Sequence, residues 1–239
     1  DTADSLHEFL AKDGKLMITL AGAMSTAELG RSLAPLIKSG MVHAITCTGA
    51  NLEEDVFNLV ARNSYHRVKN WRSLSISDEQ ELLNRGLNRV TDTCIPEEEA
   101  IRHIENLIIE SWKNGRAFPH QHLMSILDQL EYDIPAEHSW LLAAKNANIP
   151  VYVPGWEDST LGNIFASHCM SGECEASAVK SGVDYMIHLA EWYQSQNTPV
   201  GLLQIGGGIA GDFPICVVPM LRQDLKKEVD LWGWFGQIS

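Results

Sequence analysis

The sequence predicts an α/β fold, a single domain in which a mostly parallel sheet carries helices on both faces. Short apolar runs of strand length alternate with helical patterns along the chain. Several of these runs end in glycine and continue into hydroxyl or acidic residues, as expected where a strand leads through a tight turn into a helix. The 239 residues are enough to bury the core of one such domain.

The predicted elements follow one another as a parallel sheet requires. Strands are predicted at residues 15–22, 42–46, 149–153, 200–205 and 229–238. Helices are predicted at about residues 25–38, 53–61, 96–112, 123–130, 136–146, 161–170, 176–194 and 213–226. Residues 62–147 interrupt the alternation, and we interpret this segment as a helical excursion. The apolar stripe from Val183 to Trp192 is interpreted as core.

Capping residues mark the ends of several predicted helices. Ser25 or Thr26 together with Glu28 is typical of a helix start. Pro96 favours a first helical turn, and the acidic residues 97–99 suit the positive end of that helix dipole.

Composition narrows the functional classes. Hydrophobic residues make up 45% of the chain and charged residues 21%, as in ordinary globular proteins. The formal charge of −13 disfavours nucleic acid as a partner, because the phosphates would be repelled, and permits a cationic ligand. No apolar run reaches 18 residues and no signal peptide is evident, so we expect a cytoplasmic protein without a membrane partner. The five cysteines form no C-x-x-C pair and are expected to be free thiols.

The stretch from Val200 to Pro214 holds the strongest candidate binding motif. Its apolar run ends in three consecutive glycines, and Asp212 is expected to cap the helix that follows. With Gly211, the glycines match the G-x-G-x-x-G spacing of loops that hold a phosphate at a helix N-terminus. A tight turn packed against neighbouring backbone needs the same glycines, so both interpretations remain open. Asp230 has the spacing of a ribose-binding acidic residue but precedes its apolar run.

Ligands of parallel α/β sheets bind beyond the carboxyl ends of the strands, and four predicted strand exits carry Gly with hydroxyl or acidic residues. These exits are residues 22–26, 48–54, 155–158 and 206–212. Small residues at 48–50 would let a flat or phosphorylated ligand lie against backbone. Glu53 and Glu54 beside them are suited to an ammonium group, although capping of their own helix is the simpler explanation. We therefore expect a nucleotide and a cationic amine to share one crevice.

Other clusters of metal-binding residue types are interpreted as structural, and no metal site is predicted. His120 and His122 would share a metal on a strand but point apart on a helix. His168, Cys169 and Cys174 fall on apolar helical patterns without a second cysteine pair.

At these strand exits the chain resembles the deoxyhypusine synthase family, whose members bind NAD and a polyamine at the edge of a Rossmann-like sheet. The matching segments occur in family order over most of the chain: Gly22-Ala-Met-Ser25, Thr48-Gly-Ala-Asn-Leu-Glu-Glu-Asp55, Asn84-Arg-Gly-Leu-Asn-Arg89, Ile149-Pro-Val, Asp158-Ser-Thr-Leu-Gly162 and Ile205-Gly-Gly-Gly208. The continuation through Asp212-Phe-Pro is more similar to the bacterial deoxyhypusine synthase-like branch, for which forming homospermidine from putrescine is a candidate task.

The resemblance implies an NAD-dependent aminobutyl transferase that works as a homotetramer. In that family NAD takes a hydride from spermidine, the imine passes its aminobutyl group through an enzyme lysine to an acceptor amine, and the hydride returns. The acceptor is expected to be a protein lysine or putrescine. The implied cofactor-binding residues are Ser25, Thr26, Thr48, Gly49, Ala50, Glu54, Asp158, Gly206, Gly207 and Gly208. The implied substrate-binding residues are Glu53, Glu54, Asn163 and Asp212.

Departures from the family pattern bear on these expectations. Asn163 and Asp212 stand where typical synthases place an Asp and a His, so the preferred donor or acceptor is expected to differ. Thr26 and Leu29 stand where the usual synthase has Asn and Ser. The family's lysine follows a Trp-Gly pair past the last matching strand, so no catalytic residue is assigned within residues 1–239 and the lysine is expected beyond Ser239.

Three other outcomes stay open. The first is an inactive protein, and the second is a non-catalytic NAD or polyamine sensor on the same scaffold. The third, ranked last, is an ordinary dehydrogenase.

Overall fold

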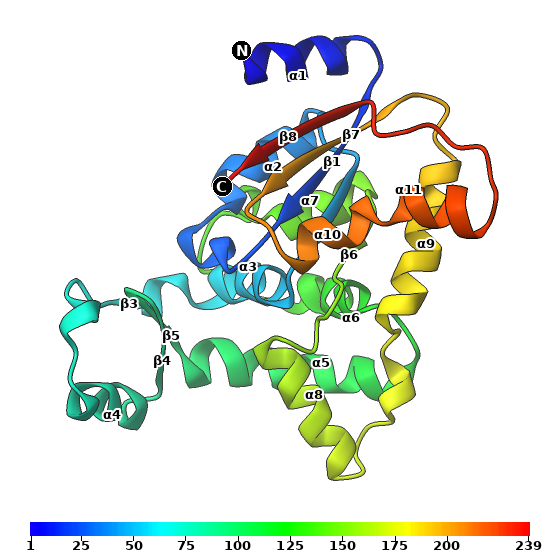
Figure 1. Cartoon of the computed structure of the whole chain (residues 1–239). Helices are drawn as coiled ribbons and strands as arrows, with labels where there is room; N and C mark the ends of the chain where they lie inside the picture. Colours follow the sequence, from blue (N-terminus) through cyan, green and yellow to red (C-terminus); the bar gives the residue numbers. More distant parts are fainter.

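The computed structural model describes residues 1–239 and confirms the α/β class (Figure 1). One sheet contains five strands, and all of its neighbouring strands run parallel. The strands are β1 (Lys15–Leu20), β2 (Ala44–Cys47), β6 (Val151–Tyr152), β7 (Val200–Ile205) and β8 (Trp234–Ile238). Their order across the sheet is β6-β2-β1-β7-β8. Numbered within this sheet the order is 3-2-1-4-5, as in the doubly wound dinucleotide-binding fold.

The central strands are apolar because both faces of the sheet are covered. β2 and β6 are buried at every residue, and β1 is buried from Leu16 onward. Ile18 at the middle of β1 lies opposite Ile45 of β2 on one side and Leu203 of β7 on the other. The sheet therefore forms the centre of one core of 50 buried residues.

Helices lie on both faces of the sheet. α2 (Gly30–Lys38) and α7 (Trp140–Ala147) pack together on one face, and α10 (Ile209–Ile215) contacts β1 and β2 from the other (Figure 1). Right-handed crossovers produce this placement, because the chain moves in opposite directions from β1 to β2 and from β7 to β8. The helix α11 (Val217–Pro219) follows α10, and α9 (Gly182–Gln194) packs against both.

A second group of helices lies beyond the carboxyl ends of the strands (Figure 1). It comprises α3 (Gly49–Ala61), α5 (His103–Asn114), α6 (Pro119–Ile126) and α8 (Thr160–Met170). α3 contacts α6, α7 and α8, so it joins this group to the sheet. None of the helices has the length and apolar character needed to cross a bilayer.

Short turns of helix complete the chain, and α1 (Thr2–Ala11) lies beside β8. The 3-10 turns are Met24–Ala27, Arg62–Ser64, Trp71–Ser73, Leu127–Gln129, Ala136–His138 and Ala176–Ala178. Glu97–Arg102 and Met220–Asp224 are π-helical.

Residues 62–96 contain a small sheet that the sequence analysis did not predict. β3 (His66–Arg67), β4 (Leu87–Val90) and β5 (Thr93–Pro96) pair antiparallel in the order β3-β5-β4, and α4 (Ile76–Asn84) lies between β3 and β4 in the chain. The expectation of a helical excursion over residues 62–147 does not hold for this part, which contains the β3-β5-β4 sheet. The two-residue turn between β4 and β5 is Thr91-Asp92, which lacks the Asn-Gly or Asp-Gly signature of such turns.

Several predicted helix starts are also wrong, three of them at the strand exits. α3 begins at Gly49 instead of Glu53, because the Thr48 side chain accepts a hydrogen bond from the backbone of Asn51. α10 begins at Ile209 with Gly208 before it, so Asp212 lies within its first turn and does not cap it. Ser25 and Thr26 belong to a separate 3-10 turn, and α2 starts only at Gly30.

The apolar stripe on α9 is only partly core. Tyr185 and Leu189 are buried, whereas the side chains of Val183 and Ile187 are 70% and 55% exposed. One face of α9 packs on the sheet and the other faces solvent.

Candidate functional site

The four predicted strand exits meet at one edge of the sheet, which we call the crest: residues 22–26 after β1, 48–54 after β2, 155–158 after β6 and 206–212 after β7. The chain leaves β1 toward β2 on one side, while β7 flanks β1 on the other side. The exits of β1 and β7 therefore flank the point where the strand order reverses, where such sheets bind their ligands.

Glycines let the crest loops touch one another. A Cβ at Gly49 would lie 2.7 Å from the Cβ of Ser159, and one at Gly206 would lie 2.6 Å from the Cβ of Ala21. At Gly155, whose φ is +63°, a Cβ would lie 2.8 Å from Ile209. Packing between the loops thus explains why these three positions are glycine. For Gly206, this agrees with the interpretation of the glycine motif as a tight turn packed against its neighbours.

Asn51 joins the exits of β1 and β2. Its Nδ2 donates to the carbonyls of Leu20, Ala21 and Gly22 at 2.9 to 3.1 Å, and its Oδ1 accepts from the backbone N–H of Ser25 at 3.0 Å. The Thr48 hydroxyl donates to the Gly22 carbonyl at 2.6 Å. Asn51 is fully buried and was not predicted as a site residue, although its position three residues after a capping Thr was a signal.

Ser25 and Thr26 face inward. Ser25 is 1% exposed, and its Oγ accepts from the indole N–H of Trp140 at 3.1 Å. The Thr26 hydroxyl donates to Glu54. Both predicted cofactor residues therefore support the crest from beneath.

Three consecutive carboxylates on α3 are buried, and each binds another element. Glu53 accepts from the N–H groups of Thr160 and Leu161 at 2.9 and 2.7 Å, one bond to each oxygen, at the start of α8. Asp55 uses both oxygens at the start of α7, where it accepts from the Ser139 hydroxyl at 2.5 Å and from backbone N–H groups at 3.1 and 3.3 Å. Negative charge is favourable at these helix N-termini. The prediction that Glu53 and Glu54 cap their own helix is wrong, because they lie in its second turn.

Glu54 differs from its two neighbours because one of its oxygens is free. Oε2 accepts from the Thr26 N–H at 3.1 Å and from its hydroxyl, while Oε1 accepts no hydrogen bond. One helical turn further on, the buried Oδ1 of Asn58 also lacks a donor. Residues four apart lie on the same face of a helix, so α3 presents two unused acceptors there.

Burial sets the ionisation of these carboxylates. Burial raises the pKa of Glu54 to about 7, although the hydrogen bonds from Thr26 act to lower it. The negative charge of Glu53 also raises the pKa of Glu54. Burial also raises the pKa of Asp55 to about 6 and raises the pKa of Glu53. A carboxylate with a raised pKa and a free oxygen gains most from a cationic partner.

The three glycines after β7 form an open turn. Gly206 and Gly208 have φ of +82° and +64°, and the N–H groups of Gly207 and Gly208 donate no hydrogen bond within the chain. A Cβ at Gly207 would meet only Gln204 Nε2, at 3.9 Å, and one at Gly208 would meet nothing within 4 Å. The turn leaves room beside free N–H groups, as an anion or a pyrophosphate requires.

The remaining predicted residues lie on the exposed rim of the crest. Asp158 and Asp212 are exposed, and their side chains form no hydrogen bond. Asn163 is exposed and donates to the carbonyls of Glu157 and Ser159 at 3.2 and 2.7 Å. Ala50 is half-buried at the start of α3.

The two histidines of α6 have separate partners. His120 hydrogen-bonds the Tyr185 hydroxyl at 2.8 Å, whereas His122 bonds Ser111 at 2.8 Å and the Ala178 carbonyl at 3.1 Å. Burial lowers the pKa of His120 to about 3. No group of three or more His, Cys, Asp or Glu side chains in the chain has an arrangement that could hold a metal ion.

Comparison with known proteins connects this chain to one family. The sequence model of the deoxyhypusine synthase family matches residues 2–231. A deoxyhypusine synthase-like protein of Chlorobaculum parvum is 24% identical over 243 residues, covering 99% of this chain and 67% of that protein. Proteins with the same description from Coxiella burnetii and Thermosynechococcus vestitus are 28% and 26% identical, covering 94% and 93% of this chain. The chain spans 57 to 67% of the length of these three relatives.

Solved structures share the fold. A crystal structure from Entamoeba histolytica whose protein carries the provisional name deoxyhypusine synthase has a TM-score of 0.54 at 13% identity, covering 82% of this chain and 60% of that one. AgrE, solved with ornithine and NAD+, has a TM-score of 0.51 at 11% identity, covering 90% of this chain and 25% of that one.

Proposed function

Because this chain belongs to the deoxyhypusine synthase family, we propose that it is the NAD- and polyamine-binding unit of an aminobutyl transferase. The donor is spermidine or a related polyamine, and the acceptor is a protein lysine or putrescine. The whole enzyme works as a homotetramer.

The observation that carries the proposal is that the open glycine turn and Glu54, with its free oxygen, both belong to the crest. The turn at Gly206–Gly208 suits the negative end of a dinucleotide, and Glu54 with Asn58 suits a donor-rich cation. Both lie at the carboxyl edge of a sheet of dinucleotide-binding order.

The residues present fit NAD. The N–H groups of Gly207 and Gly208 and the start of α3 at Gly49 and Ala50 would hold its phosphates, and Asp158 would hold a ribose. Ser25 and Thr26 would keep the crest in shape from beneath. When bound, NAD accepts a hydride from the amine donor and later returns it.

Glu54 would hold the cationic amine. In the free protein its raised pKa leaves it partly protonated near neutral pH, and an ammonium beside Oε1 would favour the charged form. Glu53 has no free oxygen and would keep α8, with Asp158 and Asn163 near its start, in place. AgrE, a neighbour of the same fold, was solved with NAD+ and a diamino acid, in agreement with this pairing of ligands.

The test is amine-dependent formation of NADH by the full-length protein. With NAD+ and spermidine, we expect NADH absorbance to rise, and with putrescine or a lysine-bearing acceptor we expect an aminobutylated product. Glu54→Gln should lower amine-dependent NADH formation at least tenfold, on the order of a lost charge-assisted hydrogen bond. Glu137→Gln, which neutralises an exposed carboxylate elsewhere, is the matched control.

Two outcomes count against the enzyme. Tight NAD+ binding without NADH formation or product would indicate the sensor alternative. An oxidised product without any aminobutyl transfer would indicate a dehydrogenase.

A further inference from the structure

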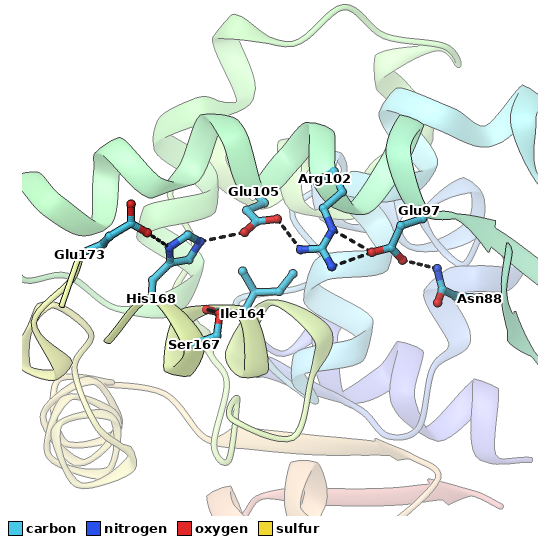
Figure 2. Close-up of polar contacts among 8 residues, drawn as sticks. All are labelled: Asn88, Glu97, Arg102, Glu105, Ile164, Ser167, His168 and Glu173. Carbon is cyan, nitrogen blue, oxygen red and sulfur yellow. Dashed lines mark hydrogen bonds and ion pairs between the residues drawn. The ribbon is translucent and has the colours of Figure 1, made fainter. Parts of the chain in front are cut away.

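A chain of charged and polar side chains connects α8, α5 and β4 (Figure 2). His168 on α8 bonds Glu105 of α5 through Nε2 at 2.8 Å and Glu173 through Nδ1 at 2.5 Å. Arg102 donates to Glu105 at 2.5 Å and to Glu97 at 2.8 Å, and Asn88 of β4 donates to Glu97 at 2.6 Å. The chain therefore connects α8 through α5 to the small sheet.

The geometry requires His168 to carry a positive charge. A neutral imidazole has one N–H and can donate to only one carboxylate, whereas both ring nitrogens here face carboxylate oxygens. The side chains of His168 and Glu105 are 14% and 16% exposed, so water does not freely replace the bond between them, whereas Glu173 is 50% exposed. The pKa values of Glu105 and Glu173 are both lowered, and with both carboxylates ionised only the imidazolium makes both bonds.

Charges on every packed element agree with this state. α5 presents Glu105, which is also bound to Arg102, and the uncharged ring of Trp112, centred 6.2 Å away. The segment after α8 presents Glu173, near Lys113 of α5. Two carboxylates contact the imidazole directly, and both cations lie behind them.

α8 is consequently held at both ends by carboxylates outside the helix, which come from α3, from α5 and from the turn that directly follows α8. Glu53 of α3 binds its first two N–H groups, and Glu105 and Glu173 bind His168 in its last turn. We propose that cationic His168 is a positioning residue that fixes α8 against α5 and so holds Asp158 and Asn163 at the crest. The link to the reaction rests on the proposed function, but the anchoring of α8 does not.

The sign of the pH dependence follows from the ring. Burial acts to lower the pKa of His168, but its hydrogen bonds with Glu173 and Glu105 outweigh this and raise it above the ordinary value of 6.5. The anchoring is therefore complete below the ordinary pKa and is lost as the pH rises through the raised one.

Amide hydrogen exchange of residues 160–170 in the full-length protein without ligands tests the anchoring directly. With α2 as the internal reference, we expect the amide protection factors of α8 in the wild type to fall about tenfold between about pH 6 and about pH 9. His168→Gln should show the low protection at both pH values, because it cannot donate to two carboxylates as a cation. His168→Lys, which stays charged, should retain protection at the higher pH. His103→Gln, an exposed histidine on α5 without a side-chain hydrogen bond, is the control.

The result that would overturn the proposal is equal α8 protection at the two pH values in the wild type, or wild-type protection in His168→Gln. If the anchoring holds and the full-length protein forms NADH, KM for the polyamine should rise with pH in the wild type but not in His168→Lys. If the anchoring holds and no turnover occurs, the proposed function fails and the role of His168 on α8 stands.

Discussion

Two groups of carboxylates differ in their surroundings, and each includes residues that hold α8: Glu53 in one group, and Glu105 and Glu173 in the other. The inner group, Glu53, Glu54 and Asp55, is buried and binds backbone N–H and hydroxyl groups, and burial raises the pKa of each member. The outer group, Glu97, Glu105 and Glu173, is partly exposed and binds Arg102 and His168. Burial would raise the pKa of Glu105, but Arg102 and His168 lower it, and the hydrogen bond from His168 lowers that of Glu173.

The difference shows that the partner, and not the residue type, decides what a carboxylate can do. A buried carboxylate that has only neutral hydrogen-bond donors is stabilised when a cation binds beside it, which makes the inner group a candidate amine site. A carboxylate that is already paired with Arg or His has its cationic partner within the protein, and it joins one structural element to another.

The largest effect should come from Asp55. Asp55→Ala would leave two backbone N–H groups at the start of α7 and the Ser139 hydroxyl without their acceptor, in a site that is 3% exposed. We expect a loss of about 3 kcal/mol in the free energy of unfolding, measured by urea denaturation. Asp128→Ala, which removes a 79% exposed partner of Lys145, should cost less than about 1 kcal/mol. Equal losses of unfolding free energy in the two variants would contradict the claim that buried and exposed carboxylates contribute differently to stability.

Glu54 should make stability depend on pH. Its folded-state pKa of about 7 lies above the ordinary value of 4.5, so the folded protein binds this proton more tightly than the unfolded chain. The free energy of unfolding should therefore fall as the pH rises through that interval, by on the order of 2 kcal/mol from this group. Denaturation of Glu54→Gln and the wild type at several pH values should show the two curves diverging above the ordinary pKa. Parallel curves would mean that Glu54 is not perturbed.

The smallest effect should come from the outer group. Glu97→Gln weakens one partner of Arg102 while Glu105 remains, and the arginine side chain is 43% exposed. We expect a loss of about 0.5 kcal/mol that disappears in about 1 M salt, measured by denaturation with and without added salt. If salt leaves the loss unchanged, the Glu97–Arg102 pair is not screened by solvent and behaves like the buried carboxylates of the inner group.

The sequence predicted the parts of the site that depend on local pattern. The apolar runs placed the strands to within a few residues, and glycines with hydroxyl and acidic residues marked the four exits that form the crest. These features were predictable because strand periodicity and turn chemistry involve neighbouring residues.

The partners of the inner carboxylates were not predictable in this way. Glu53 binds a residue 107 positions along the chain, and Asp55 binds one 84 positions away. A single sequence contains no signal for contacts of that separation, so their capping of α8 and α7 appeared only in the structure. The β4–β5 hairpin was missed for a local reason, because Thr91 adopts a φ of +55° that its residue type rarely favours.

The most direct test of the account is NAD+ binding by Gly207→Val, measured by calorimetric titration. The new side chain has room within the chain, since a Cβ there meets only Gln204 at 3.9 Å, but it would occupy the space beside the free N–H groups. Gly182→Val, at the open start of α9, is the control. We expect the dissociation constant for NAD+ to rise at least tenfold, or about 1.4 kcal/mol, in Gly207→Val and to stay unchanged in Gly182→Val. Equal NAD+ affinity in both variants and the wild type would contradict binding at the crest.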